Sequence, residues 1–87
     1  MVTVEATPEA SGWRCAVEVG GAPSRHTVHV RAEDLERWGR TGETPEQLVA
    51  RAFDFLLARE PASSILRSFA LTDITRYFPE FDREIRR

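Results

Sequence analysis

The chain has no lysine, no asparagine and a single cysteine, Cys15, among its 87 residues. One cysteine cannot form an internal disulfide, so a reducing compartment is the natural setting and we expect a cytoplasmic protein. The sequence also lacks an apolar run long enough to span a bilayer, and its N-terminus lacks the basic and then apolar segment of a secretory signal. We therefore expect no membrane association and no export.

All twelve basic residues are arginines, while the net charge is −2. Lysine and asparagine have AT-rich codons, whereas alanine and most arginine codons are GC-rich, so this bias indicates a GC-rich bacterial genome. Arginine in place of lysine is then weak evidence for anion recognition. The acidic balance disfavours nucleic acid and acidic membranes as partners. The apolar content of 41% and charged content of 30% are those of a globular chain, and its length suits one domain over residues 1–87.

The strongest pattern lies in residues 44–60 and predicts a central amphipathic helix. Thr44 suits the N-cap, Pro45 suits the first helical position, and Gln47 completes a capping box. Pro61 then ends the helix, because proline has no N–H to donate. Apolar residues recur at helical spacing along one side of it: Leu48, Val49, Ala52, Phe53, Leu56 and Leu57.

Two alternating segments, residues 13–19 and 25–31, predict a β-hairpin closed by a turn at residues 20–23. Matching their apolar sides predicts one register, which pairs Val19 with Ser24, Val17 with His26, Cys15 with Val28 and Trp13 with Val30. That register also sets Glu18 against Arg25 on the outer side, which adds an opposite-charge pair. Residues 2–6 alternate weakly and are a candidate third strand, while residues 7–11, which contain Pro8, are expected to form a loop.

The rest of the chain predicts short helices. Residues 32–38 begin with acidic side chains and precede Gly39, as a short helix does. After Pro61, three apolar residues are expected to dock on the core: Ile65, Leu66 and Phe69. Thr72 is the expected cap of a helix with Ile74, Tyr77 and Phe78 on one side, and Phe81 and Ile85 form a last amphipathic turn. The expected fold is therefore α+β: an antiparallel β-hairpin with a candidate third strand, followed by a short helix, the central helix and short C-terminal helices packed on one face.

The C-terminal half carries three motifs: FLLAREP at residues 55–61, SIL at 64–66 and YFPEF at 77–81. Together they resemble the pattern of a family of short uncharacterised bacterial proteins, over residues 44–85 of this chain. No activity, ligand or site is attached to that family, so the resemblance implies a grouping and no function. The Arg59-Glu60 pair within the motif has two interpretations, a functional pair or a structural latch to the C-terminus.

Few residues suggest chemistry. His26 and His29 are three apart on a strand, so their side chains point to opposite faces and cannot chelate one metal. Cys15 and His26 share the apolar face, but a buried cysteine usually behaves as a small hydrophobe. The serines at 63 and 64 have no nearby base, and serine at a helix start is ordinary capping. We therefore predict no catalytic, cofactor-binding or metal-binding residues, no small-molecule ligand and no enzyme activity.

The sequence supports two hypotheses about function. The leading one is a small interaction or assembly protein, which binds a protein partner or itself through an edge strand at residues 25–31 or 2–6. The alternative is a DNA-binding regulator similar to the ribbon-helix-helix repressors, because a strand followed by two helices matches their order. Its nucleic-acid-binding side chains would be Arg25, Thr27, His29 and Arg31, with the helix start at residues 44–47 available to a phosphate.

Overall fold

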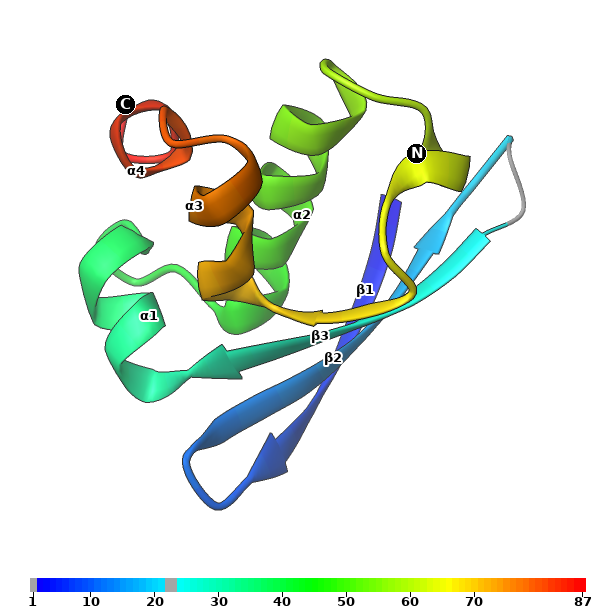
Figure 1. Cartoon of the computed structure of the whole chain (residues 1–87). Coiled ribbons are helices and arrows are strands. Elements are labelled where there is room, and N and C mark those ends of the chain that lie inside the picture. Colours follow the sequence, from blue (N-terminus) through cyan, green and yellow to red (C-terminus); the bar gives the residue numbers. More distant parts are fainter. Residues whose placement is uncertain (1, 22–23) are drawn as a thin grey trace.

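The computed structural model describes residues 2–21 and 24–87. Its strands are β1 (Val2–Glu9), β2 (Gly12–Val19), β3 (Ser24–Arg31) and the short β4 (Ser68–Ala70). They form one sheet in the order β1-β2-β3-β4, in which the first three strands are antiparallel and β4 runs parallel to β3. The helices are α1 (Ala32–Trp38), α2 (Pro45–Leu57), α3 (Ile74–Tyr77) and α4 (Phe81–Glu84), with 3-10 turns at Ala62–Ser64 and Leu71–Asp73. The helices lie on one side of the sheet (Figure 1), which confirms the predicted α+β class.

The predicted hairpin register is confirmed at every pair of β2 and β3, from Trp13 opposite Val30 to Val19 opposite Ser24. Glu18 and Arg25 meet on the open face, with 3.3 Å between the carboxylate and the guanidinium. The apolar rows of both strands point toward α2. Of the predicted turn at residues 20–23, Ala22 and Pro23 lie outside the described residues.

The predicted third strand exists as β1, but it is longer than expected. The prediction of a loop at residues 7–11 was wrong, because β1 continues through Pro8 to Glu9 and only Ala10 and Ser11 make the turn. Proline is tolerated here because β1 is an edge strand, where a missing N–H breaks no ladder hydrogen bond.

The predicted capping of α2 is confirmed. The Thr44 hydroxyl accepts a hydrogen bond from the Gln47 amide at 3.2 Å, and the Gln47 side chain accepts one from the Thr44 amide at 3.0 Å. The helix ends at Leu57, however, before the predicted stop at Pro61. The Ala58 and Glu60 amides still bond back to Asp54 and Leu56 in a closing turn, and Pro61, which restricts the residue before it, stops the chain from continuing as a helix.

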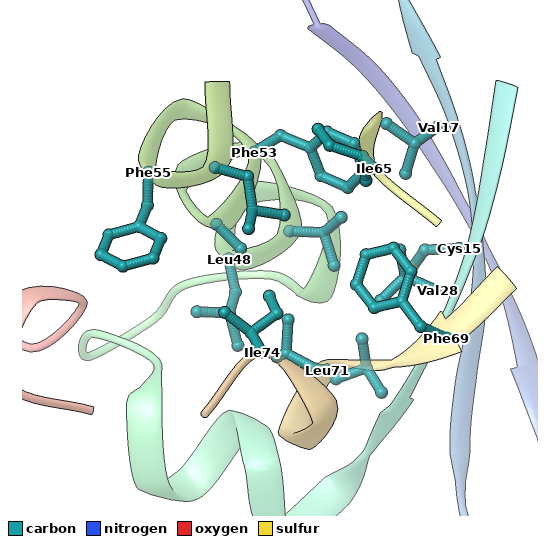
Figure 2. Close-up of a cluster of buried hydrophobic side chains, with 14 of the residues drawn as sticks. Cys15, Val17, Val28, Leu48, Phe53, Phe55, Ile65, Phe69, Leu71 and Ile74 are labelled. Atoms are coloured by element: carbon teal, nitrogen blue, oxygen red, sulfur yellow. The ribbon is translucent and has the colours of Figure 1, made fainter. Parts of the chain in front are cut away.

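One apolar position of α2 was missed. Phe55 is buried, although the periodicity placed it off the main apolar side, while Leu57 is only half-buried. Figure 2 shows the reason: Phe53 points toward the strands, whereas Phe55 points away from the sheet. There its ring packs edge-on against Phe81 and Phe78, with ring centroids 5.1 and 5.8 Å apart. The C-terminal segment therefore covers a second side of α2, which a single amphipathic stripe does not predict.

The C-terminal segment departs from the predictions in three ways. Phe69 belongs to β4 and pairs with Val28, where only docking of an apolar side chain was expected. Thr72 does not cap α3: the N-cap residue is Asp73, which makes no side-chain cap bond there, and its carboxylate instead accepts a hydrogen bond of 3.0 Å from the Ala70 amide at the start of the preceding 3-10 turn. Tyr77 is 64% exposed and so does not share the buried side of Ile74. Phe81 and Ile85 are buried as predicted.

Hydrogen bonds and ion pairs hold the C-terminal segment against α1 and α2. The Arg51 guanidinium makes two hydrogen bonds of 2.7 Å to the Glu43 carboxylate and others to the carbonyls of Trp38 and Ile85. The Trp38 indole N–H donates to Asp82 at 2.8 Å. Arg59 lies 3.3 Å from Glu80, so this half of the Arg59-Glu60 pair does connect α2 to the C-terminal segment.

Candidate functional site

The four side chains of the DNA-binding hypothesis lie along β3, on its open face. Three of them meet a carboxylate: Arg25 lies 3.3 Å from Glu18, His29 3.4 Å from Glu9 and Arg31 3.1 Å from Glu33. Thr27 lies between them, half-buried. The row therefore presents paired positive and negative charges, whereas phosphate binding needs a net positive surface.

The position of β3 in the sheet also counts against the ribbon-helix-helix hypothesis. One edge of β3 bonds to β2, and on the other edge Thr27, Val28 and His29 pair with β4. A ribbon of two chains would need that second edge. The expectation that residues 25–31 supply a free edge was therefore wrong at residues 27–29, which β4 covers. The other candidate, β1, does lie at an edge of the sheet. The helix start at Thr44 is likewise occupied by its own capping box.

Cys15 and His26 are buried residues of the hydrophobic core. Cys15 is fully buried, and burial raises the pKa of its thiol to about 11, with the Glu46 charge adding to the rise. His26 is buried as well, at only 4% exposed. Its ring packs against that of Phe53 with centroids 5.3 Å apart. A protonated thiol beside a buried imidazole is not an activated nucleophile.

Both ring nitrogens of His26 make hydrogen bonds, which the residue pattern did not predict. Nδ1 lies 2.8 Å from the Leu66 carbonyl oxygen, and Nε2 lies 2.9 Å from the Ser24 hydroxyl. A carbonyl only accepts, so Nδ1 donates to Leu66, while the Ser24 hydroxyl can serve Nε2 as donor or acceptor. The order of hydroxyl, imidazole and carbonyl is that of a nucleophile, a base and a group that orients the base. The buried ring, stacked in the core, fits a structural bridge between β3 and the segment before β4.

An apolar groove lies where that segment meets α2 and α3. Its cavity measures about 360 Å³, within the range of sites that bind small ligands or single side chains. The buried side chains of Leu56, Ile65, Phe69 and Ile74 are part of its lining. Among the described residues, the two large hydrophobic side chains that are exposed, Leu66 at 50% and Tyr77 at 64%, also line it. We call this surface the Leu66–Tyr77 groove.

The charged side chains of this groove are all acidic. Its charged lining residues are Glu60 and Asp73, and Ser64 adds a hydroxyl. Asp73 is held in place because its carboxylate caps the Ala70 amide. A second cavity, of about 510 Å³ at the other end of β3, is lined by acidic and basic side chains together, including Glu9 and Arg37. The Leu66–Tyr77 groove is thus the candidate site, with an apolar surface and acidic groups beside it.

Sequence reasoning identified Leu66 and Tyr77 as apolar but placed both against the core. The four residues of α3 make too short a helix for periodicity to orient Tyr77. Within the described residues, no group of three or more histidine, cysteine or acidic side chains is arranged to hold a metal ion. Nor does any described helix have the length and apolar character that crossing a membrane requires.

No protein-family model, curated protein or solved structure matches this chain. The grouping with short bacterial proteins that share the C-terminal motifs therefore stays a prediction. The motifs do surround the groove: Leu56 and Glu60 come from the first, Leu66 from the second, and Tyr77 and Phe78 from the third.

Proposed function

We propose that this chain is a small, non-enzymatic interaction protein of the cytoplasm that binds a segment of a partner protein in the Leu66–Tyr77 groove. The observation that carries the proposal is the coincidence of the two exposed large hydrophobic side chains with one apolar cavity. Isolated exposed hydrophobic residues are normal, whereas apolar side chains gathered around a hollow are typical of interaction sites.

The charge of the groove indicates which class of peptide segment it would bind. Glu60 and Asp73 are the charged side chains of the lining, and none of the described arginines is part of it. A segment with a large apolar side chain next to a lysine or arginine would fill the cavity and pair with these carboxylates. Acidic segments would be repelled, so charge contributes specificity while the apolar side chain contributes most of the affinity.

Selection of peptides from a random displayed library tests this proposal. We expect enrichment of sequences that place a large apolar residue beside a basic one. Leu66→Ser and Tyr77→Ser should each weaken the selected peptides about tenfold or more, because burial of such a side chain contributes roughly 1.5–3 kcal/mol. Both residues are exposed, so the variants should melt near the parent temperature.

Arg14→Ser is the matched control, since it removes a large exposed side chain from the open face of the sheet, far from the groove. It should bind the peptides as the parent does. Peptides that bind all three variants equally, or an enriched set that is acidic, would contradict the proposal.

A further inference from the structure

The backbone of β1 leaves one row of hydrogen-bonding groups unused, and their identity can be derived. Successive residues of a strand direct their N–H and C=O groups to opposite edges. The Thr27 amide donates to the Arg67 carbonyl at 2.7 Å, on the β4 side, so the odd-numbered residues of β3 face β4 and the even-numbered ones face β2. The register with β2 then assigns odd-numbered β2 residues to β3 and even-numbered ones to β1. In β1, the residues that face away from the sheet are therefore Val2, Val4, Ala6 and Pro8.

This edge is open in the described part of the chain, where β2 is the one strand paired with β1. The same three small residues, Val2, Val4 and Ala6, have half-buried side chains that pack against the core from the edge. The open-face residues between them, Thr3 and Glu5, are exposed. Natural proteins usually block such edges with charge or proline. Here Pro8 blocks only the far end, which leaves residues 2–6 available to another strand.

We infer that β1 pairs antiparallel with β1 of a second copy, about a two-fold axis through Val4. In this register Val4 faces Val4 of the second copy, and Val2 faces Ala6 on either side. Each of these outward-facing pairs exchanges two N–H···O bonds. The sheets of the two copies become one, with the helices of both on the same side.

The sequence of β1 favours this register over its neighbours. A shift that pairs Val4 with Ala6 sets the two Glu5 side chains directly opposite each other, and like charges in that position are destabilising. A shift centred on Ala6 pairs Val4 with Pro8, which has no N–H, so one bond is lost at each end. The register centred on Val4 instead sets Thr3 opposite Glu5 twice, where the hydroxyl can donate to the carboxylate, and keeps Pro8 outside the paired segment.

The paired segment of β1 shares no residue with the lining of the Leu66–Tyr77 groove. Self-association and peptide binding can therefore fail or succeed independently, and the experiments below do not depend on the proposed function.

Sedimentation equilibrium over a concentration series up to millimolar tests the dimer. The parent chain should show a monomer–dimer equilibrium, and Val4→Pro should weaken it about tenfold or more, since it removes both amides of the central pair. Pro8→Val is the matched control: it adds an outward N–H beyond the paired segment, so the dissociation constant should not change. A parent that stays monomeric throughout overturns the inference, and so does a Pro8→Val variant that associates more tightly, because that result requires a register through residue 8.

Disulfide trapping checks the register without a proline. Across a hydrogen-bonded antiparallel pair the Cα atoms lie about 5.5 Å apart, a separation that a disulfide spans. Val4→Cys should therefore form a covalent dimer under mild oxidation, and Ala6→Cys should not, because the two copies of residue 6 lie four residues apart along the strands. Cys15 is buried and does not compete. Efficient trapping at residue 6 with none at residue 4 would refute the axis through Val4.

Discussion

The buried ion pair between Arg51 and Glu43 can be tested for its contribution to holding the helices together. The Arg51 guanidinium makes a two-pronged contact of 2.7 Å with Glu43, and the Glu43 side chain is only 8% exposed. Arg51→Met keeps the apolar stem but removes both guanidinium bonds from the buried Glu43 carboxylate, which is left with the Arg40 amide and no charged partner. Such a loss costs about 3–5 kcal/mol. A domain of 87 residues has roughly 4–13 kcal/mol in total, so this is a large share.

Thermal unfolding followed by circular dichroism measures the effect. A loss of 3 kcal/mol should lower Tm by about 12 °C or more in a chain of this size. Arg14→Met is the matched control: Arg14 also pairs with a carboxylate, that of Glu9, but both side chains are well exposed. Exposed pairs contribute about 1 kcal/mol or less. If Arg51→Met and Arg14→Met melt within a few degrees of each other, the argument from burial is refuted.

The same pair should respond to acid. Hydrogen bonds from Arg51 hold the pKa of Glu43 below its ordinary value. A carboxylate with a depressed folded pKa contributes stability that is present above its unfolded pKa and lost as pH falls through the folded one. The difference in unfolding free energy between the parent and Arg51→Met should therefore be full at neutral pH and shrink in acid. A difference that stays constant from neutral pH down to strong acid would contradict the role of the charge pair.

Three other predictions concern the core and the hypothesis of DNA binding. Phe53→Ala should cost about 3–5 kcal/mol, because its ring is buried between His26 and Phe69; a melt within a few degrees of the parent would contradict this. Cys15, buried and with its thiol pKa raised to about 11, should not react with an aromatic disulfide reagent at pH 8 until denaturant unfolds the chain, and rapid reaction of the native protein would count against its burial. Duplex DNA should show no binding that weakens steeply with salt in a mobility-shift titration, and such binding, if found, would revive the ribbon-helix-helix hypothesis.

The parts of the fold that were predicted from the sequence depend on residues close together in the chain. The register of β2 and β3 follows from their alternating patterns and a short turn, and the start of α2 follows from Thr44 and Gln47. β4 could not be predicted in this way. It has only three residues, it pairs with residues 41 positions earlier, and its one buried side chain, Phe69, has no periodic neighbours.

The candidate site was harder to predict from the sequence than the fold, because it depends on which side chains are exposed more than on residue type. Leu66 and Tyr77 look like core residues in the sequence. The carbonyl of Leu66 bonds to His26, and this contact fixes the segment with the Leu66 side chain half in solvent. Only the three-dimensional packing shows that the two side chains meet one cavity.

The order of the elements along the chain also sets the order of events during synthesis on the ribosome. The three antiparallel strands and α1 emerge first and can form through local contacts, but their apolar face stays uncovered until α2 follows. The bond from Trp38 to Asp82 spans 44 positions, and the core residues Phe81 and Ile85 belong to the last seven. Until α2 emerges, a nascent chain presents the open β1 edge and an uncovered sheet face together, the combination from which pairing with a neighbouring chain begins.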